Sequence, residues 1–207
     1  MTYWFVFGLG FLAQGLFSSR IFLQWIISER HKKVLTPKLF WEISLLASCL
    51  LFVYGYLRDD FAIMLGQVIT YFIYIRNIQL EKEWTKFPVW VRWLIYLFPA
   101  IILIYGFNNN VTDRINLFSN EDIPLSLMIL GIVSQVLFTL RFVYQWLYSE
   151  AKQESLLPLG FWLLSLVGSL LIFVYAIFRL DPVLFIGHLS GIIIYSRNIF
   201  LLKRYGN

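Results

Sequence analysis

The feature that most constrains this chain is an internal repeat that covers most of its 207 residues. When Leu9–Lys82 is moved forward by 121 positions it aligns with Leu130–Lys203 without a gap, and 31 of the 74 pairs are identical. Many identical pairs are polar or aromatic residues that a membrane helix does not need for insertion. A duplication of this length means that two similar units share the fold, and it predicts a site between them.

The composition is that of an integral membrane protein. The chain is 59% hydrophobic and 14% charged, with a mean hydropathy of +0.72. A soluble domain has no means of hiding that much apolar surface, whereas a bilayer solvates it. The net charge of +5 does not point to nucleic acid, because the basic residues lie at helix ends. The single Cys49 forms no internal disulfide, so it does not identify the redox compartment.

Seven apolar segments are each close to the roughly 20 residues that a spanning helix needs. They cover about 3–28, 39–57, 61–80, 89–107, 124–148, 159–179 and 182–202. The fourth segment, which contains Pro99, has no counterpart in the repeat. Since three helices are an odd number, this linking helix returns the chain to the starting side, and both copies insert in the same orientation.

We therefore expect an all-α membrane protein of seven transmembrane helices in a 3+1+3 arrangement of parallel repeats. The expected units are a first three-helix repeat at 1–86, a linker helix at 87–110 and a second repeat at 111–207. Loops on one side carry nine Lys and Arg residues and loops on the other side carry three. This difference places the N-terminus outside and the C-terminus in the cytoplasm. The first segment is expected to be an uncleaved membrane helix.

Two arginines lie inside apolar segments, where each costs about 2.5–3.5 kcal/mol on insertion scales. Each belongs to a polar stripe on one helix face. The stripes are Gln14, Arg20, Gln24, Trp25 and Ser28 in the first copy and Gln135, Arg141, Gln145, Trp146 and Ser149 in the second. One interpretation is an anion-binding lining, because a guanidinium forks onto phosphate or carboxylate. The other is a salt bridge to Glu29 or Glu150, or snorkelling to the headgroups.

A second polar stripe follows the third helix of each copy. Its members are Gln67, Thr70, Tyr71, Tyr74 and Asn77, matched by His188, Gly191, Tyr195 and Asn198. The stripe is either a wall that binds sugar hydroxyls or a set of interhelical contacts worth about 0.6 kcal/mol each. His188, which aligns with Gln67, is either a proton carrier or a hydrogen-bonded structural residue. Arg76 and Arg197 lie off this face, near the cytoplasmic end.

Two further pairs of residues recur at the expected outer turns. Arg58 with Asp60 and Arg179 with Asp181 are predicted to pair locally and fix these turns, with an outer gate as the alternative. The hydroxyls Ser44, Ser48, Ser165 and Ser169 are expected to permit close helix packing. The sequence contains no metal-ligand cluster, phosphate-cradling glycine loop or nucleophile–base motif. We therefore expect no catalytic residue, cofactor or metal.

Each copy contains Gln-Trp-x-x-Ser-Glu, Pro-x-x-Phe-Trp-x-x-Ser and Tyr-x-Arg-Asn. This pattern resembles the lipid A biosynthesis N-terminal domain family, here in tandem. That family is in turn similar to the PQ-loop and SWEET transporters, which are also built as 3+1+3 helices. The chain departs from the SWEET pattern because Gln24 and Gln145 precede Trp and do not follow Pro. It also contains no glycosyltransferase domain, so the resemblance does not extend to synthase activity.

The resemblance implies a role beside glycosyltransferases that use polyprenyl-phosphate sugars. The leading hypothesis is a bacterial inner-membrane transporter, or flippase, for a lipid-linked sugar phosphate used in lipid A or envelope glycan modification. The arginine stripes would hold the phosphate and the second stripes the sugar. The alternatives are a facilitator for a small soluble sugar and a non-transporting membrane subunit of an envelope glycosyltransferase. Expected partners are membrane lipids, that glycosyltransferase and, as an open option, a second copy of the chain.

Overall fold

The computed structural model describes residues 3–58, 61–109 and 124–205. Within these ranges the chain forms seven α-helices and one short 3-10 helix, and no strand. They are α1 (Tyr3–His31), α2 (Lys38–Leu57), α3 (Phe61–Leu80), η1 (Trp84–Lys86), α4 (Val89–Asn109), α6 (Leu125–Lys152), α7 (Leu159–Arg179) and α8 (Pro182–Tyr205). Each of the seven predicted segments is confirmed as a helix, and most bounds agree to within a few residues.

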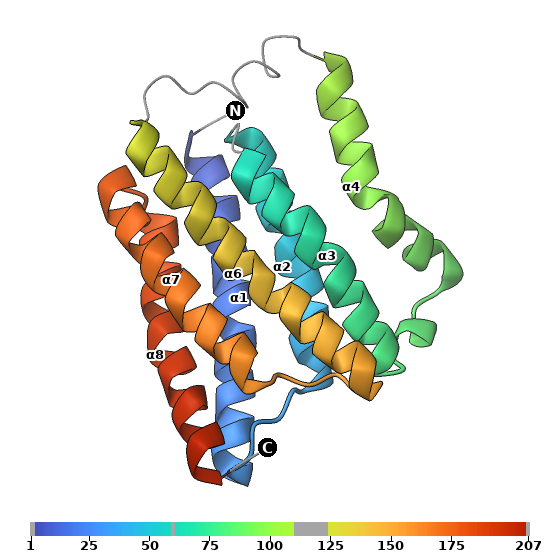
Figure 1. The fold of residues 1–207 in the computed structure, drawn as a ribbon. Coiled ribbons are helices and arrows are strands. Elements are labelled where there is room, and N and C mark those ends of the chain that lie inside the picture. The colour runs from blue at the N-terminus through green and yellow to red at the C-terminus, as the bar shows by residue number, and fades with distance from the viewer. Residues whose placement is uncertain (1–2, 59–60, 110–123, 206–207) are drawn as a thin grey trace.

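Six of the helices form a closed ring in the order α1, α2, α3, α6, α7, α8, with α8 packed against α1. In Figure 1, α1, α3, α6 and α8 run in one direction, and α2, α4 and α7 run in the other. The start of α1 and the end of α8 therefore lie at opposite ends of the bundle. Helix α4 packs outside the ring, where Ile95 O accepts a hydrogen bond of 2.8 Å from Tyr71 OH of α3.

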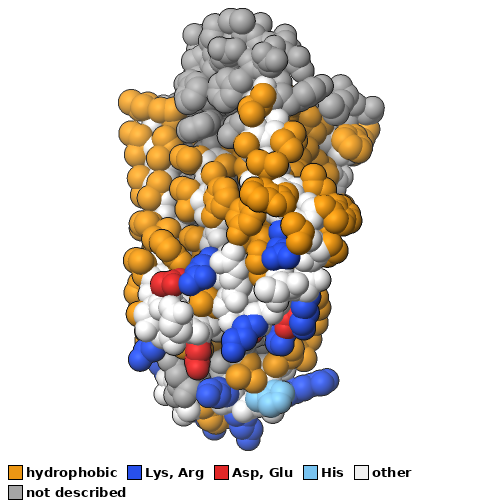
Figure 2. Space-filling model, turned by 90° about the vertical axis from the view of Figure 1, so that its right-hand side faces the viewer, with side chains coloured by type: hydrophobic (Ala, Val, Ile, Leu, Met, Phe, Trp, Pro, Cys, Tyr) orange, Lys and Arg blue, Asp and Glu red, His pale blue; other side chains and the backbone are white. Residues whose placement is uncertain are grey.

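Five helices are long and apolar enough to cross a membrane: α1, α2, α6, α7 and α8. Helices α3 and α4 are not among the five found within the described residues, so the expected total of seven spans stays a prediction. Figure 2 shows hydrophobic side chains over the upper and middle parts of the described surface, with charged side chains gathered in the lower half. This distribution fits a bundle surrounded by lipid.

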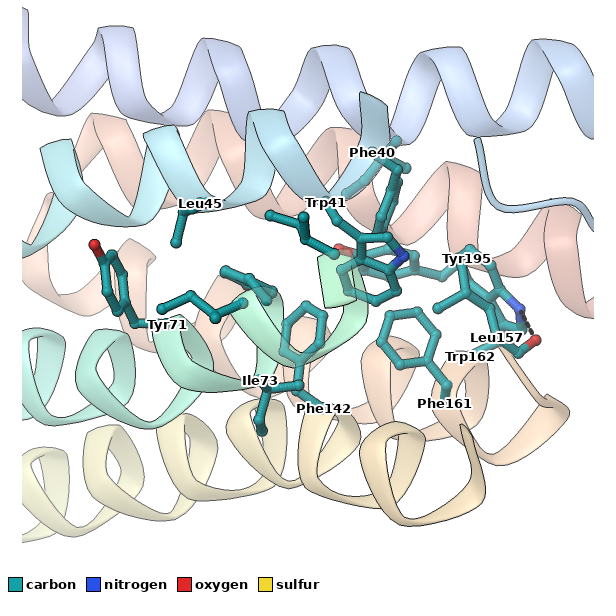
Figure 3. Packing of buried hydrophobic residues seen from close by; sticks show 14 of the residues in the cluster. Phe40, Trp41, Leu45, Tyr71, Ile73, Phe142, Leu157, Phe161, Trp162 and Tyr195 are labelled. Carbon is teal, nitrogen blue, oxygen red and sulfur yellow. Dashed lines mark hydrogen bonds between the residues drawn. The ribbon is translucent and has the colours of Figure 1, made fainter. Parts of the chain in front are cut away.

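The core is a cluster of aromatic side chains at the meeting point of the two copies (Figure 3). The repeat supplies most of it in equivalent pairs, which are Phe40 and Phe161, Trp41 and Trp162, and Tyr74 and Tyr195. Phe142 breaks this symmetry, because the equivalent residue is Ile21. Its ring lies 5.0 Å from Tyr74 of the first copy and 5.3 Å from Phe161 of the second. One unmatched ring therefore joins the two halves at their centre.

A proline stands at the N-cap of both α2 and α7. Pro37 and Pro158 directly precede these helices with extended backbone, and each carbonyl accepts the first helical hydrogen bond at 2.9 Å. The residues Lys32 and Gln153, which end the preceding helices at equivalent positions, both have positive φ. The repeat therefore extends to the backbone of the connecting loops.

Helices α6 and α7 approach closely at Gly168. A Cβ placed there would lie 2.9 Å from both the Cα and the N of Phe138. Because these are backbone atoms, the contact is relieved only if a helix moves. We expect Gly168→Ala to lower the free energy of unfolding by about 1–3 kcal/mol, the usual cost of overpacking. Thermal unfolding of the purified protein in detergent would measure this loss.

Gly15→Ala is the matched control, because no atom lies within 4 Å of a Cβ at that position. This second substitution should be neutral or stabilise the protein by about 0.5–1 kcal/mol, since alanine is the better helix former. Equal melting temperatures for the two variants would contradict the close approach of α6 and α7.

Candidate functional site

A small cavity of about 80 Å³ lies inside the ring, between the two copies. Its wall comes from α1, α3, α6 and α8, with Leu51 as the contribution of α2. The polar members of the wall are Gln14, Ser18, Arg20, Gln67, Thr70, Tyr74, Gln135, Thr139, Arg141, His188, Ser190 and Tyr195. The prediction of a polar site between the halves is consistent with this position.

The two arginines of the cavity are buried, with 2% of Arg20 and 4% of Arg141 exposed. Each guanidinium lies against three rings of its own copy. These rings are Phe17, Phe40 and Tyr74 for Arg20, at 4.6, 4.8 and 5.3 Å, and Phe138, Phe161 and Tyr195 for Arg141, at 3.3, 5.7 and 5.7 Å. Both also face the Phe142 ring, at 5.4 and 4.5 Å. The repeat thus builds two aromatic cages that share one ring.

No carboxylate of the described residues neutralises these arginines. Arg20 Nη1 donates to Ser44 Oγ, and Arg141 Nη1 donates to Tyr195 OH at 3.2 Å. The ion pairs within the described chain involve other basic residues. Glu29 and Glu150 bind Arg197 and Arg76 instead, so the alternative interpretation in which they pair with Arg20 and Arg141 is wrong.

The aromatic cages lower the free-energy cost of burying these charges but do not neutralise them. A ring face attracts a cation by about 0.5–2 kcal/mol, so three or four rings offset a burial cost of about 2.5–3.5 kcal/mol. The Nε atoms of Arg20 and Arg141 are buried and have no hydrogen-bond partner among the described residues. The cavity therefore lies beside two buried positive charges, each with one unpaired donor, and a positive charge of this kind favours an anion.

The glutamines predicted to assist the arginines lie outside this cavity. Gln24 Nε2 donates to Asn198 Oδ1 at 3.1 Å, and Gln145 Nε2 donates to Asn77 Oδ1 at 2.8 Å. Asn77 Nδ2 returns a bond of 3.1 Å to Gln145 Oε1. All four side chains are fully buried. Each bond joins one copy to the other, so the structure assigns these residues to assembly, where we had expected phosphate and sugar contacts.

The serine of each Gln-Trp-x-x-Ser-Glu motif binds the following loop. Ser28 Oγ accepts from Leu35 N at 3.0 Å, and Ser149 Oγ accepts from Leu156 N at 3.0 Å. The glutamines reach the carbonyls of the same two loop residues, at 3.3 and 3.1 Å. The motif therefore fixes its own loop and the neighbouring copy together.

The glutamates of the motif also cross between the copies. Arg76 binds Glu150 with two bonds of 2.6 and 2.8 Å, and Arg197 binds Glu29 with two bonds of 2.7 and 3.1 Å. Trp146 lies beside the first of these pairs, in a groove on the outer surface of α3 and α6. The tryptophans of the motif therefore do not line the cavity wall with the arginines, and Trp25 packs against the aromatic core.

A charge exchange tests the pairing of Arg76 with Glu150. Arg76→Glu places two carboxylates side by side, and we expect it to lower the melting temperature modestly, because each partner is more than one-third exposed and solvent screens the pair. Adding Glu150→Arg should restore most of the lost melting temperature. Arg204→Glu, at the exposed end of α8, is the control that changes net charge equally. If the double variant melts below Arg76→Glu, the pair does not join the copies.

The cavity differs between the copies at Gln67 and His188. His188 Nδ1 lies 2.9 Å from Ser169 Oγ, and its ring meets Phe138 edge to face at 4.8 Å. In the first copy Ser48 instead donates to Leu45 O of its own helix, at 2.9 Å, and Gln67 Oε1 has no partner among the described residues. The wall therefore has a hydrogen-bonded imidazole on one side and a free amide oxygen on the other.

Several predicted residues serve local roles. Tyr71 faces α4 and not the cavity. At the outer turns, the Arg58 guanidinium lies 5.1 Å from the Phe7 ring, and Asp181 Oδ1 accepts from Leu184 N at 3.1 Å near the start of α8. Arg179 is the last residue of α7. Asp60 lies outside the described residues, so its pairing with Arg58 stays a prediction.

Sequence reasoning missed two glycines that shape the cavity wall. A Cβ at Gly66 would lie 2.5 Å from Gln135 Nε2, and one at Gly187 would lie 2.7 Å from Gln14 Oε1. Each glycine belongs to one copy and each glutamine to the other. The two glycines lie 121 positions apart, so their equivalence in the repeat was the sequence signal that could have identified them. Among the described residues no group of His, Cys, Asp and Glu has the arrangement of a metal site.

Both copies match a known protein family. Residues 9–79 and 130–200 each match the family described as lipid A biosynthesis N-terminal domain. Three similar proteins are lipid-A-disaccharide synthases of Chlamydia. That of Chlamydia felis (strain Fe/C-56) is 29% identical over 208 residues, 96% of this chain and 33% of the relative. That of Chlamydia pneumoniae is 31% identical over 186 residues, which cover 86% of this chain and 30% of the relative. That of Chlamydia abortus (strain DSM 27085 / S26/3) is 30% identical over 196 residues, which cover 90% of this chain and 31% of the relative.

This chain thus spans about a third of the length of these relatives. No solved structure matches it.

Proposed function

Because this chain belongs to the lipid A biosynthesis N-terminal domain family and carries the domain twice, we propose that it binds a lipid-linked sugar phosphate and moves it across the membrane. The ligand proposed is a polyprenyl-phosphate sugar destined for lipid A or another envelope glycan. The observation that supports this most directly is the pair of buried, uncompensated arginines between the copies. A neutral sugar does not require two positive charges inside a bilayer, whereas a phosphate does.

The cavity is too small for the whole proposed ligand. A volume of about 80 Å³ corresponds to two or three water molecules, each of which takes about 30 Å³ in the liquid. This space suits a phosphoryl group but not an attached sugar. The proposal therefore includes a rearrangement in which the two copies separate around the arginines. The contacts that would break are those between α1 and α8 and between α3 and α6, because the copies meet there.

The proposed membrane arrangement follows the sequence expectations. It has the parallel 3+1+3 repeat, with units at 1–86, 87–110 and 111–207, in the bacterial inner membrane. The N-terminus is outside and the cytoplasmic end carries the basic loops. Figure 1 supports the parallel direction of the copies, because α6–α8 follow the same directions as α1–α3.

A second candidate function comes from the comparison with the synthases. Their matched part is about a third of the whole protein, and the rest lies outside this chain. The domain would then present a lipid-linked substrate to a glycosyltransferase, as a non-transporting membrane subunit. The same arginine cavity serves this role, and only the movement across the membrane differs. The soluble-sugar facilitator is less well supported, since it leaves both buried charges unexplained.

Translocation by the purified protein distinguishes these functions. Proteoliposomes would contain a fluorescent polyprenyl-phosphate sugar, and a membrane-impermeant quencher would report the fraction in the outer leaflet. Transport predicts that the protected pool becomes accessible faster than in empty liposomes. Binding without accelerated exchange would support the subunit role. If the protein neither binds the probe nor carries prenyl phosphates when lipids that co-purify with it are identified by mass spectrometry, both proposals fail.

A further inference from the structure

We propose that the prenyl chain of the ligand leaves the cavity through the seam between α3 and α6, and that the opposite seam between α8 and α1 does not take it. This inference rests on the proposed function and names the part of the protein that binds the apolar half of the ligand. An apolar groove of about 260 Å³ follows the outer side of the α3–α6 seam. Leu65 and Ile69 of α3 face Val136 and Leu140 of α6 across it.

The groove and the central cavity share part of their walls. Gly66, Gln135 and Thr139 line both spaces. Gly66 packs against the Gln135 amide and the Thr139 hydroxyl, since a Cβ there would lie 2.5 Å from Gln135 Nε2 and 3.4 Å from Thr139 Oγ1. When the phosphate of a ligand lies at the arginines, the prenyl chain attached to it can therefore enter the groove directly. The ligand needs no polar linker between its phosphate and its chain.

The apolar path continues toward the cytoplasmic end. Ile69 and Val143 also line a second space of about 630 Å³ along the same two helices. This space ends at the ion pair of Arg76 and Glu150. A long chain thus has a continuous apolar surface from the cavity to the charged end of the bundle.

The repeat identifies which seam is suited to an apolar chain. The residues equivalent to Ile69, Val136 and Leu140 on the α8–α1 seam are Ser190, Gly15 and Ser19. Ser19 and Ser190 donate to carbonyls of their own helices at 2.8 and 2.9 Å. Three of the six apolar residues that line the groove therefore correspond to two hydroxyls and a glycine. The other three, Leu65, Ile132 and Val143, correspond to Ile186, Phe11 and Phe22. The α3–α6 seam thus offers a prenyl chain a more continuous apolar surface than the α8–α1 seam.

Photolabelling tests this asymmetry. The probe is a prenyl monophosphate with a diazirine in its chain, incorporated in proteoliposomes, and labelled peptides are located by mass spectrometry. We expect labels on residues 65–76 and 132–143, and only background labelling by the corresponding prenyl alcohol. Val136→Trp fills the groove and should reduce seam labelling to that background. Leu140→Trp is a second variant at the same seam. Gly15→Trp is the matched control at the opposite seam, and open space surrounds that position.

Equal labelling of 11–22 and 186–197, or unchanged labelling of Val136→Trp and Leu140→Trp, would overturn the inference. Equal seam labelling by a diazirine-bearing phosphatidic acid would overturn the choice of a prenyl chain. The proposed function is judged separately by translocation. A protein that transports the sugar phosphate while its labels lie elsewhere contradicts only the seam. A protein that is labelled at the seam but neither binds nor exchanges the sugar phosphate contradicts only the function.

Discussion

Replacing both Arg20 and Arg141 by methionine is expected to weaken binding of a prenyl phosphate by roughly a hundredfold or more. A hydrogen bond to a charged group contributes about 1.5–3 kcal/mol, and 1.4 kcal/mol is a factor of ten in affinity. The loss of one such bond at each arginine gives this total. Binding to protein in nanodiscs, measured at several salt concentrations, reports the effect, and translocation should stop in the same variant.

Stability separates a binding role from a structural one. Methionine fills a similar volume and removes a buried charge, a change that is often neutral or stabilising. We therefore expect the double variant to keep its melting temperature. Arg204→Met, which removes a charge from the exposed end of α8, should leave binding unchanged. If the double variant binds prenyl phosphate as the native protein does, the two arginines are not the phosphate site.

The second large effect is expected at Asn77 and Asn198. Leucine at Asn77 leaves the buried Gln145 Oε1 without its donor, and such an unsatisfied group costs about 1–3 kcal/mol. Leucine at Asn198 removes one of three acceptors of Gln24 Nε2, a smaller loss of about 0.5–1.5 kcal/mol. Because the two contacts lie at different seams, their losses should add to about 1.5–4.5 kcal/mol in the double variant. Thermal unfolding in detergent and in lipid measures this loss.

A compensating change provides the control. Asn77→Leu combined with Gln145→Leu replaces both partners by apolar groups, so it should recover part of the stability lost by Asn77→Leu alone. Prenyl-phosphate affinity should stay unchanged in every variant that remains folded. A variant at Asn77 with native stability but reduced affinity for the sugar would contradict the assembly role and return this residue to the sugar site.

The helices were predictable because their signals are local. Segment length and apolarity identified α1 through α8, and the constant offset of 121 positions related the two copies. The surroundings of the polar residues of α3 were harder to predict. Gln67 and Asn77 are both buried within the bundle, which the sequence pattern alone does not establish.

The site was predictable only in part, because projecting residues onto a helix face ignores how far apart they lie along the helix axis. Arg20 and Gln24 share a face, yet a separation of four residues moves them about 6 Å along the axis. This shift takes Gln24 out of the cavity and brings it to Asn198, which lies 174 positions away in the sequence. Tyr71 shares a face with Tyr74 in the same projection, but its hydroxyl reaches the carbonyl of Ile95. Such partners depend on the ring order of the helices, which the repeat does not specify.

A chain with only one copy of the repeat would lack the reciprocal contacts between the copies. Every Gln–Asn bond and every Arg–Glu pair of the motif has one member in each copy, so a three-helix fragment would turn these groups toward lipid. A single-copy chain satisfies them only as a parallel homodimer with an exact two-fold axis. At that axis both subunits would carry the same residue. Covalent fusion is what allows Phe142 in one copy to correspond to Ile21 in the other, so that the two halves of the cavity wall differ at this position.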